Sequence, residues 1–183
     1  MAARVLVPLV DGFEEIEAVA VVDLLRRAGM AVSVAGFGKD DATGSHDMKM
    51  ATDMRMEHAL AEDFDAIVLP GGPGVRTLQG NASLCQLLRE FAAADKLVAA
   101  ICAAPTVLVK AGLLDGRAAT CFPAVESQMK GALMHPGEVV RDGQFITSQG
   151  AGTAIPFALS IVEYFDGANA ARHVADQIIF RQG

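Results

Sequence analysis

The feature that most constrains the fold is a short apolar run that ends at a cysteine and is followed by a proline. Residues 97–101 are all apolar, Cys102 follows them, and Pro105 begins a helical pattern that continues to Val109. A short continuous apolar run is typical of a parallel strand buried on both faces. Proline is accepted in the first turn of a helix, where its missing N–H would have had no partner. The run therefore predicts a sharp strand-to-helix turn at Cys102.

Strand and helix patterns alternate along the rest of the chain. Strands are expected at residues 4–10, 30–36, 65–70, 97–101 and 118–121, and a hairpin at 139–148. Helices are expected at residues 13–29, from the glycines at 71–74 towards Phe91, and at 103–111, 152–165 and 168–180. The polar segment 39–53 is expected to form a loop or hairpin, and Pro8 removes a ladder donor from the first strand. The alternation predicts a single α/β domain over residues 1–183, with a mostly parallel sheet covered by helices on both faces.

Composition narrows the functional classes. A chain of 183 residues can bury a core without a disulfide or a metal, and the residue spacing predicts neither a metal site nor a cofactor. The three cysteines are an odd number, which favours free thiols in a reducing, cytoplasmic compartment. The net charge of −7, without a basic cluster, argues against nucleic acid as a partner. The apolar runs are too short to cross a bilayer, so no membrane association is expected.

Three loops with unusual residues are expected at carboxyl ends of strands, where α/β sheets bind ligands: 11–17, 71–74 and 102–104. The positive end of a helix near Cys102 would lower the pKa of its thiol; alternatively, the cysteine is a small buried apolar residue. Gly71 and Gly72 would let backbone N–H groups face an anion, or they form a phosphate loop or only a tight turn. The acids at 14, 15 and 17 either stabilise the first helical turn or include one that turns inward.

The motifs resemble the ThiJ/PfpI superfamily, and within it the branch of the human parkinsonism-linked protein deglycase and the bacterial YajL-like proteins. The matching segments occur in the family's order from the first strand to the penultimate helix. They are Gly12-Phe-Glu-Glu-Ile-Glu17, Val68-Leu-Pro-Gly-Gly72, Val98-Ala-Ala-Ile-Cys-Ala-Ala-Pro-Thr106 and Thr147-Ser-Gln-Gly-Ala-Gly-Thr153. The resemblance implies a flavodoxin-like three-layer sandwich that forms a homodimer, with the first helix near the interface.

The resemblance also implies roles for individual residues. Cys102 would be the nucleophile, and the backbone N–H groups of Gly72 and Ala103 would hold an oxyanion. Glu17 would lie beside the sulfur as a protonated carboxylic acid, because burial and a neighbouring thiolate both raise the pKa of a carboxyl group. Such a glutamic acid can donate a hydrogen bond to the thiolate and move protons near neutral pH. The residues expected around this pair are Glu14, Gly71, Phe122 and Pro123.

Departures from related patterns limit the chemistry. Relatives that act as proteases carry a histidine directly after the cysteine, where this chain has Ala103. Glutamine amidotransferases use a histidine followed two residues later by a glutamate, and no histidine of this chain has a glutamate at that spacing. In the human relative a histidine precedes the proline that corresponds to Pro123, whereas this chain has Phe122, as in the bacterial branch. If Phe122 faces the site, strand alternation turns Cys121 away from it, so Cys121 is expected to be structural, as is Cys85. His46 is expected on the solvated surface, with an approach to the site from a partner subunit as the alternative.

Three functions follow as alternatives. The first is an enzyme that acts on α-oxoaldehydes such as methylglyoxal, free or as early adducts on protein and nucleotide groups, without metal or glutathione: a glyoxalase or deglycase. Its substrate would be a small aldehyde that adds to Cys102, with Glu17 as the proton shuttle. The second is an oxidative-stress sensor or holdase chaperone that acts through reversible oxidation of Cys102. The third is a cysteine peptidase or a protein of thiazole biosynthesis.

Overall fold

The fold is built on one central sheet. The computed structural model describes residues 2–181. The seven-stranded sheet has the order β10–β11–β7–β6–β1–β2–β5, and all neighbouring strands are parallel except β10 and β11. These strands are β1 (Arg4–Leu9), β2 (Ala31–Gly36), β5 (Met54–Arg55), β6 (Ala66–Leu69), β7 (Leu97–Ile101), β10 (Val139–Asp142) and β11 (Phe145–Ser148). The five inner parallel strands follow the flavodoxin-like order, as predicted.

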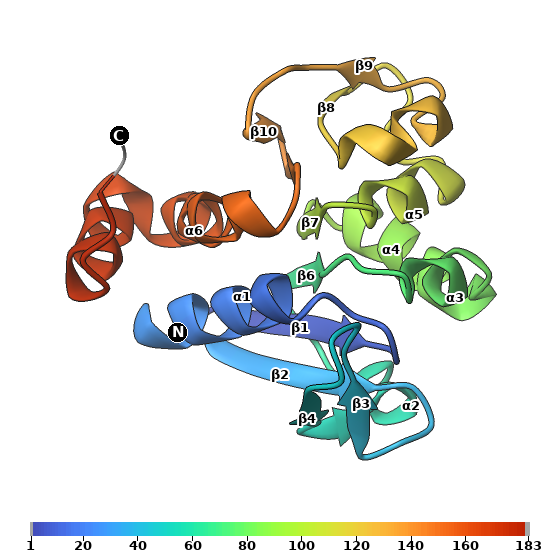
Figure 1. Cartoon of the computed structure of the whole chain (residues 1–183), viewed down its shortest axis with the longest axis horizontal. Helices are drawn as coiled ribbons and strands as arrows, with labels where there is room; N and C mark the ends of the chain where they lie inside the picture. Colours follow the sequence, from blue (N-terminus) through green and yellow to red (C-terminus); the bar gives the residue numbers. More distant parts are fainter. Residues whose placement is uncertain (1, 182–183) are drawn as a thin grey trace.

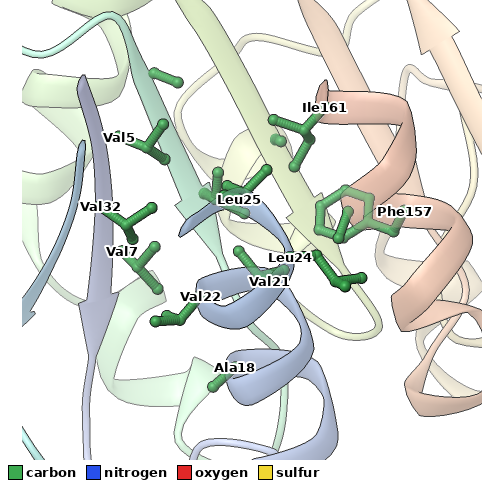
Figure 2. Close-up of a cluster of buried hydrophobic side chains, with 14 of the residues drawn as sticks. Val5, Val7, Ala18, Val21, Val22, Leu24, Leu25, Val32, Phe157 and Ile161 are labelled. Carbon is green, nitrogen blue, oxygen red and sulfur yellow. The ribbon is translucent and has the colours of Figure 1, made fainter. Parts of the chain in front are cut away.

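Helices cover both faces of this sheet (Figure 1). One face packs against α1 (Glu15–Arg27) and α6 (Ala154–Gln177). The other packs against α2 (Met56–Ala59), α3 (Val75–Gln79), α4 (Ala82–Ala93) and α5 (Pro105–Lys110). Because side chains alternate along a strand, Val5 and Val7 of β1 point to the first face, as Figure 2 shows, while Leu6 points to the second. Two apolar cores therefore flank the sheet, which is the predicted three-layer sandwich.

Most of the predicted elements are confirmed, with small shifts at their ends. The polar segment 39–53 forms a hairpin of β3 (Asp41–Thr43) and β4 (Lys49–Ala51). Pro8 is accommodated in β1 because the pairing with β6 involves only Val5 and Leu6. The C-terminal helices meet at Gly167, whose φ of 83° interrupts α6.

Three details differ from the sequence predictions. The helical stretch expected after residue 74 is two helices, because Asn81 begins α4 by accepting a hydrogen bond from the Leu84 N–H. The strand expected at 118–121 is only β8 (Ala118–Ala119), which pairs with β9 (Leu133–Met134) in a separate small sheet. Cys121 and Phe122 therefore lie beyond the strand, and strand alternation was the wrong argument for their orientation. A 3₁₀ helix, η1 (Pro123–Gln128), follows them directly.

The helix periodicity of α1 does not define its buried face completely. Ile16 and Val19 are apolar and follow helical spacing along α1, yet these residues are 59% and 48% exposed. The buried face consists instead of residues such as Val21 and Leu25, which pack against β1 and α6 (Figure 2). Among the described residues, no helix is both long and apolar enough to cross a membrane.

The core between α1 and α6 supports a stability prediction. Replacing the fully buried Leu25 by Ala should lower the free energy of unfolding by about 2–5 kcal/mol, because the lost contacts leave a cavity. The matched control is Leu133→Ala, at a side chain that is 61% exposed, which should change it by less than about 0.5 kcal/mol. Denaturant unfolding measures both values. Equal effects of the two substitutions would contradict this description of the core.

Candidate active site

Cys102 occupies a strained turn between β7 and α5. Its φ of 65° lies in the left-handed region, which costs energy for a residue with a side chain. Two backbone hydrogen bonds hold it there: the Cys102 N–H donates to the Ser148 oxygen at 2.9 Å, and the Phe122 N–H donates to the Cys102 oxygen at 2.8 Å. Ser148 belongs to the Thr147–Thr153 motif, so that motif supports the turn. The strand-to-helix turn predicted at Cys102 is confirmed.

Glu17 is the acid of its cluster that turns inward. It lies in the first turn of α1, and its side chain is completely buried. The Gly71 N–H donates to Glu17 Oε2 at 2.7 Å, while no N–H or O–H group among the described residues donates to Oε1. A carboxyl oxygen without such a partner is costly to bury as an anion. Burial therefore raises the pKa of Glu17 to about 7, although the hydrogen bonds with the Gly71 N–H and the Cys102 thiol oppose this increase; the charge of Glu14 adds a smaller increase. This is the direction predicted from the sequence.

The carboxyl group of Glu17 and the thiol of Cys102 interact directly. Burial, and then the negative charge of Glu17, raise the pKa of Cys102 to about 12, whereas the N–H groups of Ala103 and Gly72 lower it. The predicted decrease of this pKa is therefore wrong, because burial of the thiol alone already opposes its ionisation. The helix N-terminus does not compensate for burial beside a carboxylate, because α5 spans only residues 105–110. A proton on Glu17 removes the charge that opposes the thiolate, so the two groups titrate as a coupled pair.

Gly71 and Gly72 allow the close approach of three backbone segments. A Cβ atom on Gly71 would lie 2.6 Å from the Cβ of Cys102 and 2.7 Å from Glu17 Oε2. Gly72 has a φ of 100°, and a Cβ atom there would lie 2.4 Å from the Gly12 oxygen. The Glu14 N–H also donates to the Gly71 oxygen at 3.0 Å, which ties the start of α1 to this loop. The two glycines thus allow the carboxyl group, the thiol and the backbone N–H donors to meet.

A cavity of about 320 Å³ opens over Cys102. Five of its lining residues belong to the loops and motifs considered above: Gly72, Pro73, Cys102, Ala103 and Thr106. Phe122 also lines it, but Pro123, Glu14 and Gly71 do not, and Glu17 lies beneath its floor. The lining residues that the sequence did not indicate are Val75, Arg76, Gln79, Val125 and Gln128. They come from α3 and η1, and only the position of α3 directly after the glycine loop could have suggested its two polar residues.

A larger hollow, of about 770 Å³, lies between β10 and α6. Neither Cys102 nor Glu17 borders it. Its lining has no nucleophile paired with a group of raised pKa, so the smaller cavity is the better candidate for an active site.

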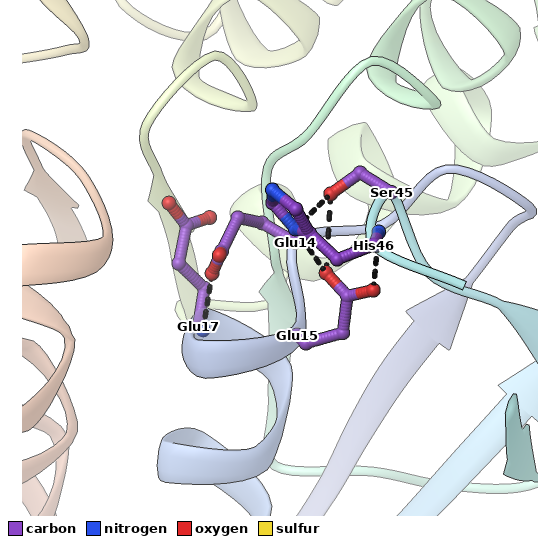
Figure 3. Close-up of polar contacts among 5 residues, drawn as sticks. All are labelled: Glu14, Glu15, Glu17, Ser45 and His46. Carbon is purple, nitrogen blue, oxygen red and sulfur yellow. Dashed lines mark hydrogen bonds and ion pairs between the residues drawn. The ribbon is translucent and has the colours of Figure 1, made fainter. Parts of the chain in front are cut away.

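The remaining acids of the first cluster have structural partners (Figure 3). Glu14 caps α1, where its Oε2 accepts a hydrogen bond from the Glu17 N–H at 2.8 Å. Glu15 accepts hydrogen bonds from the His46 N–H at 2.6 Å and from the Ser45 hydroxyl at 3.1 Å, and it contacts His46 Nδ1 at 3.0 Å. Burial opposes ionisation of Glu15, but these hydrogen bonds outweigh it and lower its pKa to about 2. The bond to Glu15 in turn raises the pKa of His46.

Neither a histidine nor a second cysteine reaches the cavity. His46 is largely exposed and, within the described part of the chain, no histidine lines the cavity. Cys121 is buried away from it, and its Sγ contacts the Phe122 oxygen at 3.4 Å. Burial raises the pKa of Cys121 to about 11, which makes it a poor nucleophile. Cys85 is buried in α4. The thiol at the cavity has a carboxyl group as its partner instead of an imidazole.

Comparison with known proteins shows the family and the fold of the chain. The model of the DJ-1/PfpI family matches residues 3–164, and the chain belongs to this family. It is 39% identical to protein dj-1beta of Drosophila melanogaster over 183 residues, which cover 98% of both chains. It is 33% identical to a deglycase of Pyrococcus abyssi, over 81% of this chain and 91% of that protein. The crystal structure of Drosophila DJ-1beta matches with a TM-score of 0.94 and 36% identity over all of both chains. Oxidised DJ-1 of Toxoplasma gondii matches with a TM-score of 0.95 and 34% identity, over 99% of this chain and 100% of that one.

The close approach at Gly71 gives a prediction. Gly71→Ala should displace either the Glu17 carboxyl group or the Cys102 side chain, because both lie inside the contact distance of the new methyl group. We expect a lower melting temperature and at least a tenfold change in the rate at which iodoacetamide alkylates Cys102, equivalent to about 1.4 kcal/mol. The control is Gly152→Ala, where a Cβ atom would meet nothing within 4 Å. A Gly71→Ala protein that matches this control in both measurements would contradict the geometry.

The raised pKa of Glu17 predicts a pH-dependent stability difference. Between pH 4.5 and about 7 the folded protein holds a proton on Glu17 that the unfolded chain has lost. The free energy of unfolding should therefore fall as the pH rises through this window, by about 2–3 kcal/mol from this group. Glu17→Gln lacks this titrating group. The free energy of unfolding of the variant minus that of the natural protein should therefore increase by about 2–3 kcal/mol from pH 4.5 to 7. Urea unfolding across this range measures the difference, and a constant difference would refute the raised pKa.

Proposed function

We propose that this protein is a cysteine-dependent enzyme that converts α-oxoaldehydes to hydroxy acids without metal or glutathione. The observation that carries the proposal is the contact between Cys102 and the buried Glu17, whose pKa lies near neutrality, at the floor of a cavity. The name of the Pyrococcus relative, a deglycase, supports the same class of chemistry. Early adducts of oxoaldehydes on protein and nucleotide groups are further substrates of this kind.

The reaction starts from the form of the coupled pair in which Glu17 holds the proton and Cys102 is a thiolate. This is the minor form of the pair, because the pKa of Cys102 lies above that of Glu17. The Cys102 thiolate adds to the aldehyde carbon of methylglyoxal, and the carbonyl π-electrons move to the oxygen. The backbone N–H groups of Gly72 and Ala103 stabilise that oxyanion, and Glu17 then protonates it to give a hemithioacetal. Proton transfer from Glu17 leaves a carboxylate, which is the base that the next step requires.

The Glu17 carboxylate then removes the proton from the former aldehyde carbon and returns it to the adjacent ketone carbon. The proton of the hemithioacetal hydroxyl group passes to the oxygen of that former ketone. The product is a thioester of lactate on Cys102. Water adds to the thioester carbon, the carbon–sulfur bond breaks, and lactate leaves. Of the two protons that the water brings, one restores the proton on the Cys102–Glu17 pair and the other passes to solvent as lactate forms. The aldehyde carbon is oxidised and the adjacent carbon reduced within the same molecule, so the reaction needs no external oxidant or reductant.

The enzymatic proposal predicts how variants behave with methylglyoxal. Cys102→Ala should lose activity by at least about 10³-fold, and Glu17→Gln by about 10²–10⁴-fold, because the amide cannot carry the proton. Cys121→Ala is the matched control and should retain activity, since this thiol does not line the cavity. The measurement is lactate formation in the absence of glutathione. Activity that persists in Cys102→Ala would refute the mechanism.

A redox sensor is the second candidate, and the exposure of Cys102 favours it. Cys102 is partly exposed, whereas Cys85 and Cys121 are buried. A protein that releases no lactate, but whose Cys102 is oxidised by mild peroxide treatment and reduced again by thiols, would favour the sensor over the enzyme. The same experiment on Glu17→Gln shows whether the carboxyl group controls oxidation.

We also propose that the protein forms a homodimer through α1. The exposed Ile16 and Val19 on this helix support an interface, because they leave apolar area in contact with water. Sedimentation of the natural protein and of Val19→Glu tests this directly, and a monomeric natural protein would refute it.

A further inference from the structure

The cavity over Cys102 continues into a second hollow. The first has a volume of about 320 Å³ and the second of about 370 Å³. They share the side chains of Gln79, Thr106 and Gln128. We call the two together the Cys102 groove. It extends from the thiol, past these three residues, to Lys110 at its far end.

The charged side chains that line the groove are all positive. Arg76 borders the part that contains Cys102, and Lys110 borders the part beyond Gln79. No Asp or Glu is among the described residues that line either part. Neither cation forms an ion pair within the described part of the chain. In a protein with a net charge of −7, this makes the groove a local site of positive potential beside the nucleophile.

The polar residues between the two cations are held in place by hydrogen bonds. Gln79 Nε2 donates to Thr106 Oγ1 at 2.7 Å and lies 3.4 Å from Gln128 Oε1. The Thr106 hydroxyl donates to the Ala103 oxygen at 2.6 Å. This chain of contacts joins α3, α5 and η1 to the turn at Cys102. It also orients the Gln128 carboxamide, whose nitrogen has no acceptor among the described residues and can donate to a ligand.

We propose that the groove selects substrates that carry an anionic group, a carboxylate or a phosphate, close to the carbonyl that Cys102 attacks. Arg76 is the specificity-determining residue, because its guanidinium can donate two parallel hydrogen bonds to such a group. Lys110 borders only the part of the groove that does not contain Cys102, so it would contact the far end of a longer substrate. The identity of the substrate rests on the proposed function, but the preference for anions does not require catalysis.

Two alkylating reagents test the preference without turnover. Iodoacetate and iodoacetamide have nearly the same size and react with the same thiolate, but only iodoacetate is charged. The ratio of their rates at Cys102 therefore cancels any effect of Arg76 on thiol ionisation. Arg76→Gln should lower the ratio of the iodoacetate rate to the iodoacetamide rate by about tenfold, as expected for two charges several ångströms apart near a surface. Arg76→Lys should restore most of it.

The matched control is Arg172→Gln, an exposed arginine that borders the hollow at α6, and it should leave the ratio unchanged. Inorganic phosphate and succinate should each slow iodoacetamide in the natural protein more than in Arg76→Gln, which tests phosphate and carboxylate separately. A ratio that is the same in Arg76→Gln and the natural protein would overturn the inference, whether or not methylglyoxal is converted. A lowered ratio in a protein that does not convert methylglyoxal would support the anion preference of the groove and refute only the proposed reaction.

Discussion

The structure of the site depends on the burial of one carboxyl group against one thiol. Glu17 is completely buried, and one of its oxygens receives no N–H or O–H donor from the described residues, so ionising it is unfavourable. Cys102 faces the same difficulty, because burial and a neighbouring charge both oppose its ionisation. The two groups therefore compete for a single proton. Whichever group holds that proton decides whether the site contains a nucleophile and an acid or an inert thiol and a base.

The fold supplies this pair from elements that are distant in the sequence. Residues 17, 71 and 102 follow β1, β6 and β7, which are neighbours in the sheet, so their carboxyl ends meet at one edge. The apolar cores on both faces fix α1 and α5 against the strands. Backbone hydrogen bonds between Gly12, Glu14 and the glycine loop then set the distances between these segments. The positive φ of Cys102 is maintained by this surrounding structure, which offsets its cost.

Much of this arrangement could be predicted from the sequence. Buried strands, the turn at Cys102 and the inward position of Glu17 followed from apolar runs, a proline and the family motifs. The raised pKa of Cys102 could not be predicted. The direction of its shift depends on how deeply folding buries the thiol and on the charge of Glu17 beside it. Arg76 and Gln128 were also missed, since they come from α3 and η1 and meet at the cavity only after folding. Likewise, the exposure of Ile16 depends on where α6 packs, which helix periodicity does not determine.

The protonation state of Glu17 is the central claim, and infrared spectroscopy measures it most directly. The difference spectrum between the natural protein and Glu17→Gln isolates the carbonyl stretch of this one carboxyl group. The account predicts a protonated carboxylic acid band at mildly acidic pH that is lost as the pH rises through about 7. A band that disappears near pH 4.5, the ordinary value for glutamate, would show that burial does not hold the proton and would contradict the account.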